Sequence, residues 1–464
     1  MANRTSAERR TAITEQPIAS QLIRLTAPML LALVSVMGLG VVDSYFVAFL
    51  GTVELAAIGF TAPVTAVITS VALGLGMAIS SRTSRLIGEN KSEQASRLIS
   101  DGFLLTTVIA MLAVMALALT NNSIFAALGA KNDTLAFING YMRIWLIGAP
   151  LIMLTQVASS TFRALGDTAS AAKIAVVLTL LNMIFDPLFI FGFGPIPAMG
   201  VEGAAIATVA AVLIASGYAL YRLYWVEAVL LLDRPRWAQL KTNLDSLIQI
   251  AVPAMLANAI VPIIATALTT VVAVLGTATV AGWGVAVRIE LLMLMVVYAL
   301  SSTLPMFIGQ NLGAQKPDRV HQALTIAFRF VFVWQALLTL GAWAMADAIT
   351  ALFTDDPVVA QSIRLFLSIV PVSHGLAGAV ILINVSMNVL GKPRWALYIN
   401  LLRLCALTLP LALLGRHIAG FEGVLLGIAL GHLLAFGIAI LLLNRVLIEQ
   451  GVPAIAFSRK HRIT

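Results

Sequence analysis

The sequence is poor in charged residues. Only 11% of its 464 residues are Asp, Glu, Lys or Arg, whereas charged residues make up about 25% of a soluble globular domain. Hydrophobic residues account for 60%, and the mean hydropathy is +0.97. This composition excludes an ordinary soluble protein and indicates an integral membrane protein with many spans.

Cysteine is almost absent. The single Cys405 lies in an apolar segment, which excludes an intrachain disulfide and a thiolate metal cluster, and we interpret it as a small buried hydrophobe. Residues 1–16 are polar and lack an apolar signal-peptide core, so we expect no cleavable signal peptide. We expect no cofactor and no enzymatic activity, because neither an HExxH nor a GxS nucleophile pattern supports one.

Apolar segments recur along the whole chain. A bilayer is crossed by roughly 20 apolar residues in a helix, and twelve segments qualify as spans. We therefore predict an all-α membrane protein with spans at about 22–50, 55–80, 102–120, 141–160, 172–194, 203–224, 247–274, 278–307, 323–345, 363–388, 396–415 and 422–444.

The basic residues predict the orientation in the membrane. Of the 29 Lys and Arg residues, 22 lie in the two tails and in the connections on one side, while the opposite loops hold only Lys131 and Arg416. Because cytoplasmic loops are enriched in Lys and Arg, we expect both termini in the cytoplasm of a bacterium, with the spans in its inner membrane. The net charge of +8 thus reflects topology, and we reject nucleic-acid binding.

An internal repeat divides the chain in two. Pro28, Gly51-Thr52, Gly59 and Leu165-Gly166 recur at an offset of 225, as Pro253, Gly276-Thr277, Gly284 and Leu390-Gly391. Two further pairs match at other offsets: residues 200–203 with 420–423, and residues 87–90 with 308–311. Six spans per half give the halves the same orientation, an architecture typical of transporters. We predict an N-terminal tail (1–21), an N-lobe (22–224), a linker (225–246), a C-lobe (247–447) and a C-terminal tail (448–464).

Between Leu25 and Leu50 the first span carries one charged side chain, Asp43. A carboxylate there costs at least ~2.5–3.5 kcal/mol on insertion scales, so we interpret its presence as functional. Pro28, Gly38 and Gly40 lie in the same segment and are candidate hinge residues, because they allow the helix to bend.

Further oxygen-bearing side chains lie in the fifth and sixth spans. Asn182 and Asp186 are four residues apart and share one helical face, and Thr208 follows in the sixth span. Hard monovalent cations prefer oxygen ligands, and two neighbouring carboxyl groups in a low dielectric share protons. Either H⁺ or Na⁺ therefore fits a site formed by Asp43, Asn182, Asp186 and Thr208. The acids belong to the N-lobe alone, because Leu268 and Leu411 occupy the equivalent positions of the C-lobe.

Other polar residues inside spans are candidates for the cavity lining. They are Gln156, Arg288 and Glu290. Arg288 and Glu290 are two residues apart and do not face each other, so Glu290 either lines the cavity or pairs with another helix.

The sequence resembles the multidrug and toxic compound extrusion (MATE) family from about Gln21 to Leu447. The resemblance is carried by VVDSYFVAFLGTVELAAIGFTAPV (41–64), FRALGDT (162–168), LNMIFDPLFIFGFG (181–194), GVEGAAIAT (200–208), AVRIE (286–290), IGQNLGAQ (308–315) and MNVLGKPR (387–394). The resemblance implies a fold of twelve helices in two six-helix lobes and exchange of H⁺ or Na⁺ for organic cations and amphipathic drugs.

Within this family the sequence is similar to the DinF-like branch. The resemblance implies an N-lobe cation site at Asp43, Asn182, Asp186 and Thr208. The NorM-like branch has acids in spans seven and ten, whereas residues 247–274 and 363–388 contain none, which argues against cation coupling in the C-lobe. The family precedent implies a monomer that works by alternating access.

Two alternatives remain. A flippase for lipids or lipid-linked oligosaccharides would share the architecture and would need a cationic cavity, for which only Arg288 and Arg403 are candidates. An intramembrane aspartyl enzyme would use Asp43 and Asp186 and leave the C-lobe without a role. We favour the cation-coupled exporter.

Overall fold

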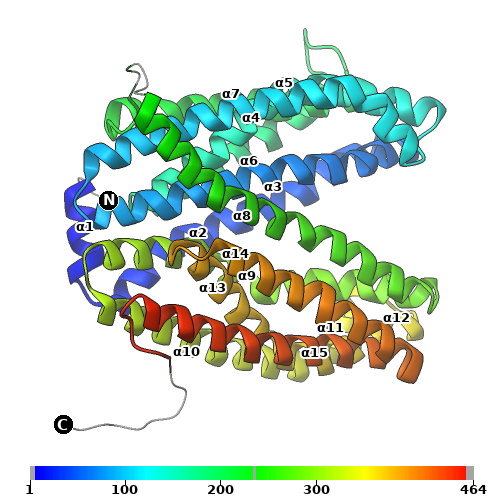
Figure 1. Ribbon diagram of the computed structural model, residues 1–464. Helices are drawn as coiled ribbons and strands as arrows, with labels where there is room; N and C mark the ends of the chain where they lie inside the picture. The colour runs from blue at the N-terminus through cyan, green and yellow to red at the C-terminus, as the bar shows by residue number, and fades with distance from the viewer. Residues whose placement is uncertain (1–5, 232, 234–236, 456–464) are drawn as a thin grey trace. The chain divides into compact units, whose positions relative to one another are not determined.

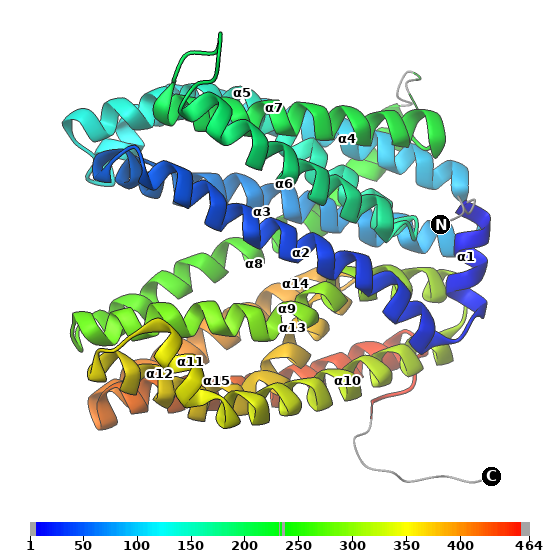
Figure 2. The same ribbon diagram turned by 180° about the vertical axis from the view of Figure 1, so that it is seen from behind.

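The described residues are almost entirely helical. The computed structural model describes residues 6–231, 233 and 237–455 (Figures 1 and 2). Eleven helical segments in this part of the chain are long and apolar enough to cross a membrane. The last one, Pro393–Glu449, has non-helical dihedral angles at Ala419 and Gly420 and so accounts for two of the predicted spans. The predicted all-α, twelve-helix membrane fold is confirmed.

The chain forms two compact units. The first comprises Arg24–Met255 with the described part of Met1–Arg10, and the second comprises Thr11–Ile23 with the described part of Leu256–Thr464. The predicted tails, 1–21 and 448–464, lie partly outside the described residues, as do positions 232 and 234–236 of the predicted linker. Helix α1 (Ser6–Glu15) lies in the predicted N-terminal tail, and α8 (Trp237–Ala273) begins inside the predicted linker.

The first unit is a bundle in which α5 is central. Helix α5 packs against α3, α4, α6 and α7, and these helices run alongside one another in both views (Figures 1 and 2). Small residues permit this close packing: a Cβ on Gly76 of α3 would overlap the side chain of Ser160 of α5. The helices are α2 (Ile18–Ala48), α3 (Thr52–Gly88), α4 (Ser92–Ala127), α5 (Asn132–Ala164), α6 (Thr168–Ile190), α7 (Gly200–Tyr221) and the π-helix η1 (Arg222–Val226).

The second unit packs around α9 and α13. Helix α9 contacts α10, α12 and α13, and a buried apolar cluster that includes Trp283, Ile363 and Phe366 joins α9 to α12. The tenth span of the chain, which lies in this unit, is interrupted by a short 3₁₀ segment at Pro371. The elements are α9 (Thr277–Gly313), α10 (Pro317–Ala344), α11 (Ala346–Phe353), α12 (Pro357–Ile369), η2 (Val370–Ser373), α13 (His374–Val389), α14 (Pro393–Leu401), the π-helix η3 (Leu402–Thr408) and α15 (Leu409–Glu449).

The backbone repeats as the sequence does. Gly51 and Gly276 begin α3 and α9 with positive φ (143° and 116°), and Gly166 and Gly391 share φ values of 80° and 78°. Each of these conformations favours glycine, which explains why the same glycines occur in both halves.

One predicted repeat pairing is wrong. The sequence matches residues 87–90 with 308–311, but Asn90 has the positive φ (62°) that Gln315 has in the second unit (56°). The turn hydrogen bonds agree, because Lys91 N donates to Leu86 O and Lys316 N donates to Asn311 O. The helix ends therefore correspond at the offset of 225, and the apparent match at 221 lies one helical turn too early.

Cys405 also differs from expectation. We predicted a small buried hydrophobe, but Cys405 lies in η3 and is exposed on the surface of the protein. Inside a membrane span an exposed apolar side chain faces lipid, so its hydrophobic surroundings do not require burial in the protein.

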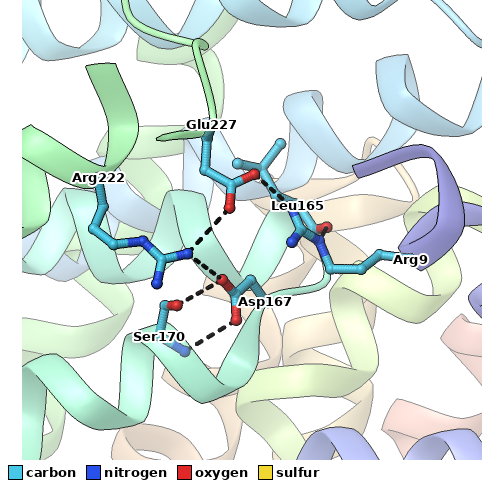
Figure 3. Close-up of polar contacts among 6 residues, drawn as sticks. All are labelled: Arg9, Leu165, Asp167, Ser170, Arg222 and Glu227. Atoms are coloured by element: carbon cyan, nitrogen blue, oxygen red, sulfur yellow. Dashed lines mark hydrogen bonds and ion pairs between the residues drawn. The ribbon is translucent and has the colours of Figure 1, made fainter. Parts of the chain in front are cut away.

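A network of ion pairs joins three segments of the first unit (Figure 3). The carboxylate of Glu227 accepts from Arg9 of α1 and from Arg222 (3.4 Å). Arg222 also donates to Asp167 (3.3 Å), and Asp167 caps α6 by accepting from Ser170 N (3.0 Å). The four charged side chains are only 6–14% exposed. The FRALGDT motif thus contributes an N-cap and a charge that holds Arg222.

We expect Glu227→Gln to lower the free energy of unfolding by about 3 kcal/mol, because it leaves Arg9 and Arg222 partly buried without their shared counter-charge. Thermal unfolding of the purified protein in detergent measures this effect. The matched control is Glu449→Gln, which removes an exposed pair with Lys392 (2.9 Å) and should leave the unfolding temperature nearly unchanged. Equal losses in the two variants would contradict a structural role for the network.

Candidate functional site

The four residues predicted to bind the coupling cation come together inside the first unit. Asp43 lies on α2, Asn182 and Asp186 lie on α6, and Thr208 lies on α7. Asn182 and Asp186 are each only 2% exposed, and Asp43 is half-buried. Four residues from three spans therefore share one site, which sequence spacing could predict only for the pair on α6.

Close packing of α6 and α7 brings Asn182 and Thr208 together. A Cβ on Gly203 of α7 would overlap the backbone of Phe189 of α6. The absence of a side chain at Gly203 allows the two helices to approach, and Thr208 follows just over one turn later. The Oγ1 atom of Thr208 then lies 3.3 Å from the amide of Asn182.

The side-chain amide of Asn182 joins both acids. Oriented as its neighbours require, its nitrogen donates to Asp186 Oδ2 (2.7 Å) and to Asp43 Oδ1 (3.2 Å), while its oxygen accepts from Thr208 Oγ1 (3.3 Å). Asn182 is thus the bridge between the acid on α2 and the acid on α6.

The carboxyl groups of Asp43 and Asp186 also lie close enough to form a hydrogen bond with each other. A carboxylate only accepts hydrogen bonds, so this contact needs a proton on one of the two groups. In a low dielectric a single shared proton also relieves the repulsion between neighbouring carboxylates. The geometry is that of a carboxyl pair that exchanges between one proton and two.

The acids open into a cavity of about 400 Å³ within the first unit. Its polar lining consists of Asp43, Asp186, Tyr141 and Thr208, and its apolar lining includes Val47, Leu55, Ile58 and Ile190. A mostly apolar cavity with a few converging polar groups is typical of a ligand site.

Tyr141 was not identified from the sequence. Its phenol lies close enough to interact electrostatically with both Asp43 and Asp186. No sequence pattern distinguishes Tyr141 from an interfacial aromatic residue at the beginning of a span. Only the packing of α5 reveals it as a neighbour of the acids.

The other predicted residues lie away from this cavity lining. Gln156 is half-buried on α5, where its carbonyl accepts from Ser160 (3.0 Å). In the second unit, Arg288 is exposed on α9 and Glu290 is half-buried on a different face, in agreement with their spacing. Helix α2 is continuous through the candidate hinge residues Pro28, Gly38 and Gly40.

The donor set fits a proton or a monovalent cation. Among the described residues, no group of three or more His, Cys, Asp or Glu side chains could hold a metal ion. Na⁺ would take oxygen ligands from Asp43, Asp186 and Thr208. For Asn182 to join them, its amide would have to rotate and give up its hydrogen bonds to the two acids, whereas a proton needs no rotation.

Comparison with known proteins identifies a family. The MatE family model matches the chain twice, over residues 28–188 and 253–414, which reproduces the repeat. The crystal structure of the Vibrio cholerae MATE transporter VcmN in the bent form superposes with a TM-score of 0.88, at 34% identity over 94% of this chain and 98% of that one.

Two curated relatives show the range of the similarity. The FAD transporter of Shewanella oneidensis is 38% identical over 429 residues, which cover 91% of this chain and 93% of the relative. The multidrug export protein MepA of Staphylococcus aureus is 24% identical over 417 residues, covering 89% and 90% of the two chains.

We expect Gly203→Ala to separate α6 from α7 and to cost roughly 1–3 kcal/mol through overpacking against Phe189. Thermal unfolding of the purified protein measures this cost. The control is Gly217→Ala on the same helix, where a Cβ would meet nothing within 4 Å. Since alanine favours the helix, this control should leave stability unchanged or raise it. The packing argument is wrong if both variants unfold at the same temperature.

Proposed function

Because the chain belongs to the MatE family of transporters, we propose that it is a proton-coupled antiporter that exports organic cations and amphipathic compounds across the bacterial inner membrane. The observation that carries this proposal is the close pair of Asp43 and Asp186, which Asn182 joins and which lines a cavity of about 400 Å³. The DinF-like assignment and cytoplasmic termini belong to the same proposal.

A proton is the ion that suits this arrangement. One proton allows the two neighbouring carboxyl groups to form a hydrogen bond, and Asn182 stabilises the remaining negative charge with its amide nitrogen. Taking up a second proton neutralises both acids, and it does not require the acids to give up their contacts to the protein. Na⁺ remains the alternative coupling ion at the same residues.

The charge of the pair links proton binding to substrate binding. When the pair holds one proton, the cavity has a net negative charge that attracts organic cations. Uptake of another proton from the outer side removes this charge and weakens binding, which releases the substrate. A membrane potential of 100 mV contributes ~2.3 kcal/mol per net charge moved, so it adds to the pH gradient when two protons are exchanged for one monovalent organic cation.

A flavin dinucleotide is the second candidate substrate. The Shewanella oneidensis relative that is 38% identical over 91% of this chain is an FAD transporter, whereas the multidrug exporter MepA is 24% identical. FAD carries phosphate groups and would need cationic partners, for which Arg288 and Arg403 of the second unit are candidates. The same two residues would serve a lipid-linked phosphate in a flippase.

The coupling ion can be identified in proteoliposomes that contain a fluorescent organic cation, with a pH gradient and a Na⁺ gradient imposed separately. We expect the pH gradient alone to drive transport, and Asp43→Asn to abolish it because the pair can no longer exchange protons. The control Asp133→Asn changes an exposed acid of α5 and should transport normally. FAD added as a competitor tests the second substrate. If only the Na⁺ gradient drives transport, Na⁺ and not the proton is the coupling ion. If neither gradient moves the dye, the proposed function is wrong.

The hinge residues of α2 give a separate test. A Cβ at Gly38 or Gly40 would meet nothing within 4 Å, so Gly38→Ala and Gly40→Ala should fold normally. Alanine stabilises the helical conformation relative to glycine by up to about 1 kcal/mol per residue, so the helix bends less readily. We therefore expect the double variant to keep substrate affinity but to transport several-fold more slowly. Unchanged transport rates in proteoliposomes would remove the hinge from the mechanism.

A further inference from the structure

The second unit contains a polar cluster of its own, although it lacks the acids that the NorM-like branch has in spans seven and ten. Glu290 of α9 is its only acid: its side chain is 27% exposed, and its Oε1 atom lies 3.9 Å from Nε2 of His374 at the beginning of α13. This distance exceeds a hydrogen bond, so the two groups are close without being bonded.

His374 is fully buried, with an exposed fraction of 0%. Neither of its ring nitrogens has a hydrogen-bond partner among the described residues. Leaving a buried polar group unpaired costs roughly 1–3 kcal/mol, which makes an imidazole without partners an unusual core residue. Glu290, whose Oε1 atom is 3.9 Å from Nε2, is a group that could form the missing bond.

His432 of α15 shows how a purely structural histidine is satisfied in the same unit. Its Nδ1 atom lies 2.9 Å from Ser373 Oγ, and the hydroxyl of Ser373 donates to Val370 O (2.8 Å). His432 therefore has a hydrogen-bond partner within the second unit. His374, one residue after Ser373, has no comparable contact.

Arg403 supplies positive charge to the cluster from the π-helix η3. Its Nη2 atom is 3.5 Å from Asn400 Oδ1, and its buried Nε has no hydrogen-bond partner in the described part of the chain. Arg403 interacts electrostatically with Glu290 and with His432. Isolated π-helical turns often occur at functional sites, and here the turn places Arg403 within range of Glu290.

Uncharged side chains lie on α9 and on the helices that pack against it. Tyr298, two turns after Glu290 on the same helix, interacts with it electrostatically. Helix α10 contributes Gln335, which donates to Met293 O (2.9 Å), and α12 contributes Phe366, whose ring lies 6.4 Å from that of His374. Arg288, the nearest basic residue in sequence, is exposed.

We propose that Glu290 and His374 form a second proton-binding site, inside the second unit and separate from Asp43 and Asp186. A proton from water reaches the carboxylate of Glu290, whose side chain is 27% exposed, and makes it a neutral acid. The O–H of this acid then donates to Nε2 of the neutral His374 ring, and the net charge of Glu290 and Arg403 together changes from zero to +1. Binding the proton creates the hydrogen bond that His374 lacks.

The second proton-binding site does not depend on the proposed function, but its effect on transport does. If the chain is a proton-coupled antiporter, the second site raises the number of protons exchanged per substrate. The experiment therefore measures proton binding directly, before transport.

The test is infrared difference spectroscopy of the purified protein as pH is changed, in an Asp43→Asn/Asp186→Asn background that removes the first site. We expect a carbonyl band from a protonated buried carboxyl group, which disappears when Glu290→Gln is added. His374→Gln should move the pH midpoint of this band, which a merely structural histidine would not do. Glu422→Gln, which changes an exposed acid of the same unit, should leave the band in place.

The outcomes are distinguishable. A difference spectrum that Glu290→Gln leaves unchanged would overturn the proposal, provided that size-exclusion chromatography shows a folded protein. If Glu290→Gln does not fold, the midpoint in His374→Gln decides alone, and an unshifted midpoint overturns the proposal. In proteoliposomes, Glu290→Gln should still move the fluorescent cation but with fewer protons per cation. Loss of pH-driven transport in the wild type would contradict the proposed function without affecting the infrared result.

Discussion

The first unit depends on one constraint: a carboxyl group placed inside a membrane span must find its partners within the protein. Asp43 and Asp186 meet this constraint through each other and through Asn182, which donates to both. Their partners require α2, α6 and α7 to approach closely, and Gly203 allows α6 and α7 to do so. The close packing of these helices is therefore what brings the ion-binding side chains together.

The two units share a backbone but not a chemistry. Gly51 and Gly276 begin equivalent helices with the same unusual dihedral angles, so the fold is duplicated. The buried charges are not duplicated: Leu268 and Leu411 replace the two acids, while Thr65 and Ala149 occupy the positions equivalent to Glu290 and His374. Each unit therefore carries its own polar cluster at positions where the other unit has an uncharged residue, so changes to either cluster can be made separately.

The fold extends across proteins whose sequences differ widely. VcmN superposes with a TM-score of 0.88 at 34% identity, and MepA aligns over 89% of the chain at 24% identity. Glycines with positive φ and small residues between helices are the features that the backbone itself requires, since other residues would strain or clash there. Side chains that line a cavity are not constrained in this way, which leaves room for different substrates within one architecture.

The sequence by itself determined the number of spans, the two-fold repeat and the pair of Asn182 and Asp186, because these follow from hydrophobic length, a constant offset and helical periodicity. It misjudged the pairing of Asn90, since similar letters one turn apart look equivalent until the helix end is seen. It also misjudged Cys405, because apolar surroundings in sequence do not distinguish lipid from protein. Only the tertiary structure identified Tyr141 beside the acids and His374 beside Glu290. Those neighbours come from different helices, and their proximity depends on how the helices pack rather than on any spacing along the chain.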